Sequence, residues 1–295
     1  MYNKKIQSFS FSSGEAGDSV KKIFPILFSF FLLNACSLQG KAILEEPERE
    51  FGWKEKESIP ADFVPQTLHL TALGDSLTEG VGSGQGGYVY YFAQELLQLK
   101  GVSDVKTENF GVKGLKSAGL LEQLQKGGND IEEALRRADL IVITIGGNDL
   151  MQVVKENFLH LTITPFLKTK IQYEENLRTI LQKIRGTNSR ATVLVFGLYN
   201  PFSYLLEEIP EMDQILARWN ETIRGVAEDF AGTYFVEVAD LFQRDISSLL
   251  YKDQFHPNDE GYRLIARRAF SFLEKDVEPT RDNGWFVKGE GTSEN

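Results

Sequence analysis

A serine and a histidine far apart in the chain have the neighbours that a nucleophile and its base need. Ser76 lies in the run Gly74-Asp75-Ser76-Leu77, and His256 lies in the run Asp253-Gln254-Phe255-His256-Pro257. A serine hydroxyl becomes a good nucleophile only when a base takes its proton, and imidazole titrates near neutral pH. Asp253 precedes His256 by three residues, so a turn can bring its carboxylate to the imidazole. These side chains predict a Ser-His-Asp triad, which is defined by roles and geometry rather than by order in the chain.

The elements that must position these side chains are predicted from hydrophobic periodicity. Strands are expected over 68–73, 105–110, 139–145, 191–196 and 234–238, and helices over 90–99, 174–184, 212–230 and 259–272. Strands that alternate with helices form βαβ units, so we expect an α/β fold with a parallel sheet and right-handed crossovers. Ligands bind such sheets at the carboxyl ends of the strands, which is where the serine block falls.

Two further short blocks follow predicted strands, namely Asn109–Gly114 (NFGVKG) and Gly146–Asp149 (GGND). With the serine and histidine blocks, in this order, they make the sequence resemble the GDSL or SGNH family of esterases and lipases over about residues 68–273. The resemblance implies a three-layer α/β/α structure of the SGNH-hydrolase, flavodoxin-like type, with a central, mainly parallel five-stranded sheet. It also implies a serine ester hydrolase that works through an acyl-enzyme, without a metal or a cofactor.

The resemblance further assigns an oxyanion hole to the backbone N–H groups of Ser76 and Gly114 and to the side-chain amide of Asn148. A tetrahedral intermediate needs such preorganised donors, and glycine lets the backbone approach closely. Gly111 competes with Gly114 for the second position. Gly114 is preferred because it lies five residues after Asn109, as in the family pattern.

Two apolar segments at the catalytic end are candidates for substrate binding. They cover 150–167, with Met151 and Phe158, and 198–209, with Tyr199 and Phe202. We expect them to form an acyl-binding groove or a lid; the alternative is packing against neighbouring helices. The predicted substrates are lysophospholipids or short-to-medium acyl esters. One alternative is removal of O-acetyl groups from cell-wall or other glycans. An alternative of another class is a non-catalytic surface binding lipoprotein with the same fold.

Two other patterns bear on the class of protein. The run Gly82–Gly87 (GSGQGG) satisfies a GxGxxG pattern, but it does not directly follow the first strand, as a dinucleotide-binding turn would. A mobile loop at the active site is expected there instead. The sequence contains no G-x-S-x-G, which argues against the nucleophile elbow of ordinary α/β-hydrolases.

The N-terminus is typical of a secreted, lipid-anchored protein. Lys21 and Lys22 precede an apolar run over 23–33, which is too short to span a bilayer and suits a signal peptide. The run ends in Leu33-Asn34-Ala35-Cys36, which resembles the lipobox of bacterial lipoproteins, in which the cysteine is lipidated. We therefore predict a signal peptide over 1–35, of which 1–19 is hypothesised to be an untranslated extension.

The remaining domain predictions follow from composition and length. Residues 36–66 begin with the lipidated cysteine and are rich in Glu, Lys and Pro, which indicates a flexible tether reaching about 30 Å. A single hydrolase domain is expected over 67–276, followed by a polar tail over 277–295. The chain carries a net charge of −10, three histidines and one cysteine. This composition disfavours binding to nucleic acid and a usual zinc site. We expect a monomer outside the cytoplasm, anchored to the cell membrane, with a Gram-positive surface favoured.

Overall fold

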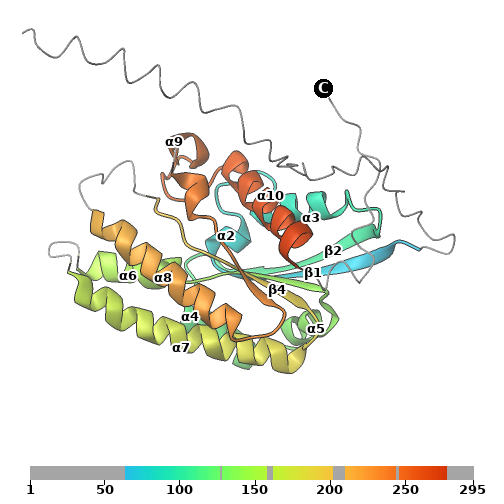
Figure 1. The fold of residues 1–295 in the computed structure, drawn as a ribbon, viewed down its shortest axis with the longest axis horizontal. Coiled ribbons are helices and arrows are strands. Elements are labelled where there is room, and N and C mark those ends of the chain that lie inside the picture. The colour runs from blue at the N-terminus through green and yellow to red at the C-terminus, as the bar shows by residue number, and fades with distance from the viewer. Residues whose placement is uncertain (1–63, 127, 158–161, 202–209, 244–245, 278–295) are drawn as a thin grey trace, which may run out of the picture. The chain divides into compact units, whose positions relative to one another are not determined.

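Five apolar runs form one sheet in which every neighbouring pair of strands is parallel. In the computed structural model, which describes residues 64–126, 128–157, 162–201, 210–243 and 246–277, the strand order is β2-β1-β3-β4-β5 (Figure 1). The strands are β1 (Gln66–Gly74), β2 (Val102–Gly111), β3 (Leu140–Thr144), β4 (Thr192–Phe196) and β5 (Thr233–Val236). This order is that of flavodoxin-like doubly wound sheets, and it confirms the predicted fold class.

Helices cover both faces of the sheet. On one face lie α3 (Gly87–Leu96) and α10 (Asp259–Asp276), and on the other lie α4 (Ser117–Lys126), α7 (Ile163–Thr187) and α8 (Pro210–Glu228), as Figure 1 shows. The shorter elements are α2 (Ser76–Glu79), α5 (Asn129–Arg137), α6 (Gly147–Glu156), the 3₁₀ helix η1 (Ala239–Phe242) and α9 (Ile246–Leu249). Every residue of β3 and β4 is buried, because both faces of these strands are covered.

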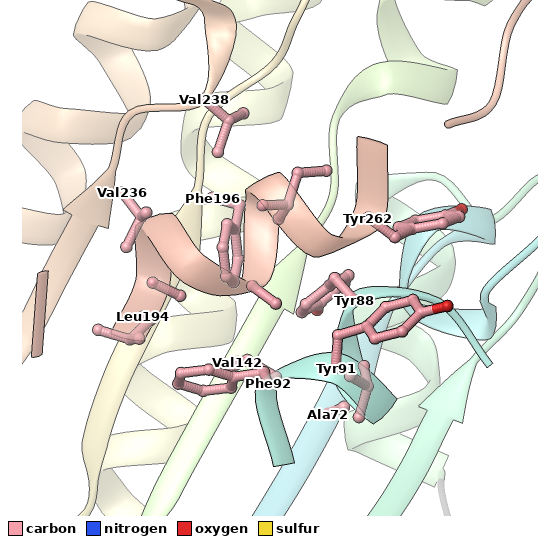
Figure 2. Packing of buried hydrophobic residues seen from close by; sticks show 14 of the residues in the cluster. Ala72, Tyr88, Tyr91, Phe92, Val142, Leu194, Phe196, Val236, Val238 and Tyr262 are labelled. Carbon is pink, nitrogen blue, oxygen red and sulfur yellow. The ribbon is translucent and has the colours of Figure 1, made fainter. Parts of the chain in front are cut away.

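The core consists of two apolar clusters, one on each side of the sheet. Between the sheet and the pair α3 and α10, the rings of Tyr88 and Phe196 lie 4.9 Å apart, and Tyr262 packs beside them (Figure 2). On the other side, the rings of Tyr173 and Trp219 stack at 5.0 Å between α7 and α8. Full burial of a large apolar side chain stabilises the fold by about 1.5–3 kcal/mol. These clusters therefore fix the helices against the two faces of the sheet.

Near the catalytic end, the helices cover more of the chain than the sequence prediction gave. Residues 150–167 were expected to be an apolar loop, but α6 extends to Glu156 and α7 begins at Ile163, eleven residues before the predicted start at 174. Pro165 lies in the first turn of α7, where a missing N–H costs no intrahelical hydrogen bond. The apolar side chains there belong to helices that pack on each other, which limits the expected groove or lid to a part of the segment.

Several predictions fall outside the described residues. They are the signal peptide over 1–35, Cys36, the tether up to residue 63, the tail from residue 278, and the candidate substrate residues Phe158 and Phe202. Within the ranges that the structure describes, no helix is both long and apolar enough to cross a membrane. In the same ranges, no three His, Cys, Asp or Glu side chains gather as metal ligands would.

Candidate active site

Ser76 begins a short helix directly after the first strand of the sheet. β1 ends at Gly74, where φ is +142° and an added Cβ would lie 2.1 Å from the carbonyl oxygen of Thr144. Only glycine therefore allows β1 to end this close to β3. Asp75 caps α2 by accepting a hydrogen bond of 3.1 Å from the backbone N–H of Leu77. The turn between β1 and α2 places Ser76 at the carboxyl end of the sheet.

His256 is held in a loop that is closed by hydrogen bonds and leads into α10. The N–H of Tyr251 donates to the carbonyl oxygen of His256 at 2.7 Å, and Leu250 and Pro257 form an isolated antiparallel bridge. Gln254 has a left-handed φ of 57°, which turns the chain between Asp253 and His256. Asn258 caps α10 by accepting from the N–H groups of Glu260 and Gly261, as expected of Asn at a helix start.

The structure brings Ser76, His256 and Asp253 together in one hydrogen-bonded chain. His256 Nε2 lies 2.9 Å from Ser76 Oγ, and His256 Nδ1 lies 2.6 Å from Asp253 Oδ2. Ser76 and His256 are buried, with 5% and 8% of their surface exposed. This arrangement lets the imidazole take the hydroxyl proton while the carboxylate fixes its tautomer.

Asp253 is bound on both carboxylate oxygens. Its Oδ1 accepts hydrogen bonds of 3.0 Å from the N–H groups of Phe255 and His256, and its Oδ2 faces the imidazole. Burial raises the pKa of Asp253, but the hydrogen bonds from the side chain and N–H of His256 outweigh burial, so the pKa lies below its ordinary value of 3.8. The carboxylate is therefore ionised at neutral pH and can stabilise an imidazolium.

Of the candidate oxyanion donors, Ser76 and Asn148 line the same pocket, and Gly114 lies one residue before Leu115, which Asn148 contacts. Gly114 has a left-handed φ of +79°, and an added Cβ would meet no atom within 4 Å. Asn148 lies in the first turn of α6 and donates a hydrogen bond of 3.0 Å to the carbonyl oxygen of Leu115. Gly111, the alternative to Gly114, donates its N–H to Asn109 Oδ1 at 2.9 Å, and an added Cβ would lie 2.2 Å from the backbone nitrogen of Glu79. Because the N–H of Gly111 already donates to Asn109 Oδ1, Gly114 is the better candidate.

Two buried aspartates, Asp149 and Asp75, accept hydrogen bonds that connect the elements around the site. Asp149 accepts from the N–H and the hydroxyl of Ser117, at 2.9 and 2.6 Å, which ties α6 to α4. Asp75 accepts from Thr144 Oγ1 at 2.9 Å, and the hydroxyl of Thr144 lies 2.7 Å from that of Thr78. Burial raises the pKa of Asp75 from 3.8 to about 7, and burial also raises the pKa of Asp149.

A mainly apolar pocket opens beside Ser76. It contains Met151 and Tyr199, two of the substrate residues predicted from the sequence, while the other two lie outside the described residues. Three further apolar lining residues, Leu150, Leu198 and Pro201, lie in the two predicted segments, whereas sequence reasoning missed Leu77, Met212, Leu216 and Phe255. Met212 and Leu216 are four residues apart on α8, a spacing that places them on one face of the helix. The sequence shows this spacing, but the spacing alone does not indicate which cavity this face of α8 borders.

The pocket wall is also tied to the histidine loop. The hydroxyl of Tyr199 donates to the carbonyl oxygen of Phe255 at 2.6 Å, and its ring stacks on Phe242 at 4.1 Å. Tyr199 therefore holds the residue that precedes His256 against the end of β4. The pocket and the hydrogen-bonded chain consequently form one unit, in which an acyl group can lie next to the serine hydroxyl.

Comparison with known proteins agrees with this geometry. The model of the GDSL-like Lipase/Acylhydrolase family matches residues 72–264. The uncharacterized protein YpmR of Bacillus subtilis is 34% identical over 261 residues, which cover 88% of this chain and 98% of that protein. The spore germination lipase LipC of Bacillus licheniformis is 29% identical over 212 residues, which cover 68% and 94% of the two chains.

A solved structure shows the same architecture. The lipase Lip_vut3 from a goat rumen metagenome superposes with a TM-score of 0.62 and 28% identity, covering 69% of this chain and 96% of that one. The family 3 carbohydrate esterase of Clostridium thermocellum, at 20% identity and a TM-score of 0.52, shares the fold. The match to the family model covers all four sequence blocks, three of which contribute residues to the pocket.

Proposed function

Because the chain belongs to the GDSL-like lipase/acylhydrolase family, whose members hydrolyse carboxylic esters, we propose that it does so with Ser76 as nucleophile, through an acyl-enzyme. The observation that carries this proposal is the hydrogen-bonded chain from Ser76 Oγ through His256 to Asp253. Serine hydrolases of unrelated folds share this arrangement of roles.

Acylation uses the triad and the candidate oxyanion donors. Ser76 Oγ attacks the ester carbonyl carbon while His256 Nε2 takes the hydroxyl proton. The negative charge that develops on the carbonyl oxygen is stabilised by the N–H groups of Ser76 and Gly114 and by the amide of Asn148. As the intermediate collapses, the bond to the alcohol oxygen breaks and the alcohol leaves with the proton from His256. Asp253 stabilises the imidazolium throughout.

Deacylation repeats these steps with water in place of the serine. His256 takes a proton from water, and the resulting hydroxide attacks the acyl carbon. The tetrahedral intermediate again occupies the oxyanion hole, and its collapse releases the carboxylic acid and returns the proton to Ser76 Oγ. The residues of this chain therefore account for every proton that moves in the cycle.

We propose lipid-type esters, such as lysophospholipids or esters of short-to-medium acyl chains, as substrates. The apolar lining around Met151, Leu216 and Phe255 supports an acyl group in the pocket beside Ser76. Two of the similar proteins are called lipases, the spore germination lipase of Bacillus licheniformis and the rumen lipase. An apolar pocket favours acyl chains longer than acetate because each buried methylene contributes about 0.8 kcal/mol.

We also propose that the protein acts as a monomer on the outer side of the cell membrane. The lipobox-like Leu33–Cys36 supports cleavage of residues 1–35 and lipidation of Cys36, and the polar sequence over 36–66 supports a tether. Both Bacillus relatives come from Gram-positive bacteria, which supports a Gram-positive surface. Because one chain supplies the whole triad, the site needs no second copy. Palmitate labelling of the wild type that is lost in Cys36→Ser supports the anchor, and labelling of both contradicts lipidation at Cys36.

The first test of the proposed function is hydrolysis of p-nitrophenyl esters from acetate to decanoate by the full chain and by Ser76→Ala. We expect the wild type to hydrolyse the series with an optimum beyond acetate, and the variant to lose this activity. An optimum at acetate would favour the removal of O-acetyl groups instead. A folded wild type that hydrolyses none of the esters would overturn the proposed ester hydrolysis and favour a binding protein.

A further inference from the structure

The glycine-rich segment Gly80–Gly87, which the catalytic chemistry does not use, joins the helix of Ser76 to α3. Sequence reasoning predicted a mobile loop here, but the structure ties the segment to the start of α10. Gly80 ends α2 in the left-handed region, with φ +90° and its N–H donating to the carbonyl oxygen of Ser76. Any displacement of the segment is therefore transmitted directly to the turn that carries the nucleophile.

Asp259 is the centre of this attachment. Its Oδ1 accepts hydrogen bonds from Ser83 Oγ at 2.5 Å, from Tyr91 Oη at 2.9 Å and from the N–H of Gly84 at 3.2 Å. The Ser83 hydroxyl, which donates to this carboxylate, is the first of the causes that hold the pKa of Asp259 below its ordinary value of 3.8. Hydrogen bonds to an ionised acceptor are stronger than those between neutral groups. One carboxylate thus binds both the segment that follows α2 and the side chain of Tyr91 in α3.

A second attachment lies one turn further along α10. The hydroxyl of Tyr262 donates to the carbonyl oxygen of Val81 at 2.7 Å. Between the two attachments, Gly82 has a φ of +95°, and an added Cβ would lie 2.5 Å from the carbonyl oxygen of Pro257. The backbone after the nucleophile therefore touches the backbone after the histidine, with no side chain between them.

We propose that Asp259 and Tyr262 are positioning residues that set the distance between Ser76 Oγ and His256 Nε2, an inference that rests on the proposed function. His256 lies three residues before Asp259, and Ser76 lies four residues before Gly80. The attachments through Asp259 and Tyr262 therefore act as a clamp, because they join the segment that follows Ser76 to the helix that follows His256. Because a misplacement of 1 Å can cost about 100-fold in rate, loss of the clamp lowers the rate of serine attack without changing the binding pocket.

The test compares Asp259→Ala with Glu260→Ala in the full chain. Both residues are acidic and lie in the first turn of α10, so both substitutions remove the same favourable charge from the helix N-terminus. The side chain of Glu260 faces Arg263, at 3.4 Å, and not the glycine-rich segment. Glu260→Ala is therefore a matched control for the charge and for helix stability.

The readout is the rate at which an alkyl fluorophosphonate labels Ser76. In this reaction the serine oxygen bonds to phosphorus, fluoride leaves, and His256 takes the hydroxyl proton, so the rate reports the alignment of serine and histidine. We expect labelling and kcat to fall about 10–100-fold in Asp259→Ala, with KM within about twofold of the wild type. Glu260→Ala should stay within about twofold, and Asp259→Asn, which keeps an acceptor oxygen, should recover most of the rate.

Further variants keep the inference falsifiable if Asp259→Ala does not fold. The double variant Ser83→Ala and Tyr91→Phe removes two donors to Asp259 and leaves α10 intact, and Tyr262→Phe removes only the bond to Val81. Equal labelling rates in the wild type and in these folded variants would overturn the clamp. A wild type that does not react with the fluorophosphonate would instead overturn the proposed serine mechanism, so the two failures are distinguishable.

Discussion

The side-chain amide of Asn148 donates a hydrogen bond of 3.0 Å to the carbonyl oxygen of Leu115, the residue that follows Gly114. This contact joins two of the proposed oxyanion donors, because it fixes the amide of one against the turn that carries the other. A primary amide has two hydrogens. One of them anchors Asn148 to the turn, and the second can donate to the substrate. Preorganised donors of this kind stabilise an oxyanion without reorganising during the reaction.

We predict that Asn148→Ala lowers kcat about 10²–10³-fold, while KM changes little, because the donor acts mainly on the transition state. The measurement is steady-state hydrolysis of p-nitrophenyl butyrate. Lys155→Ala, on the exposed side of the same helix, is the control and should match the wild type. A kcat for Asn148→Ala within about threefold of the control would remove Asn148 from the oxyanion hole.

Asp253→Asn should lower kcat about 10³–10⁴-fold without unfolding the histidine loop. The amide oxygen can still accept from the N–H groups of Phe255 and His256, as Oδ1 does in the wild type. The amide nitrogen, however, would face His256 Nδ1 as a donor and force the wrong tautomer. Rates are compared at pH 8 together with melting temperatures. A variant that melts like the wild type and keeps more than about a tenth of its kcat would contradict the role of Asp253 as orienting carboxylate.

Asp75 should make the protein less stable as the pH rises from about 4 to about 7. Burial raises its pKa from 3.8 to about 7, so between these values the folded protein binds more protons at this site than the unfolded chain does. The contribution of this site to the free energy of unfolding therefore falls between about pH 4 and pH 7 and is constant above, with a total change of about 4 kcal/mol at most. Asp75→Asn does not titrate and keeps an acceptor for Leu77 and Thr144.

The expected result is a melting temperature of Asp75→Asn, relative to the wild type, that is higher at pH 8 than at pH 5. Thermal unfolding followed by circular dichroism at both pH values measures this difference. Asp130→Asn, at an exposed position in α5, serves as the control for a lost carboxylate. Parallel pH dependences of the wild type and Asp75→Asn would show that Asp75 does not titrate in this range.

Much of the fold could be predicted because the strands are short apolar runs with clear boundaries. β3 and β4 are buried at every position, and a short, continuously apolar run such as Leu140–Thr144 is typical of a buried strand in a parallel sheet. The helices α4 and α5 were not predicted. Only Ser117 and Leu120 of α4, and Ala134 and Leu135 of α5, are buried, so few apolar residues mark these two short helices. A helix with a narrow buried face leaves little trace in the sequence.

The site was predictable where its residues follow strand ends, and not where its contacts join distant segments. Ser76, His256 and Asp253 could be identified from short blocks, and the structure brings them within hydrogen-bonding distance. The contact between Ser83 and Asp259 links positions 176 residues apart, and no motif around either residue indicates that the two make contact. The role of Gly82 likewise depends on the close approach of Pro257, which only the folded chain defines.

Met151, which was predicted from the sequence as a substrate residue and lines the pocket beside Ser76, should control the preferred chain length. It lies on α6, half-buried at the pocket beside Ser76, so its side chain can change without emptying the core. Met151→Phe narrows the pocket and should lower the ratio of kcat/KM for octanoate to that for acetate. Met151→Ala widens the pocket and should raise this ratio, because one methylene in such a pocket is worth about 1–3 kcal/mol.

The measurement is the rate on p-nitrophenyl esters of both acids, so that acetate serves as an internal reference for the chemical step. Gln152→Ala, at the neighbouring exposed position of α6, controls for effects on the helix and should leave the ratio unchanged. Ratios within about twofold of the wild type in both Met151 variants would mean that the acyl chain does not enter this pocket. The acyl chain would then have to leave Ser76 in another direction, and the apolar lining would serve packing alone.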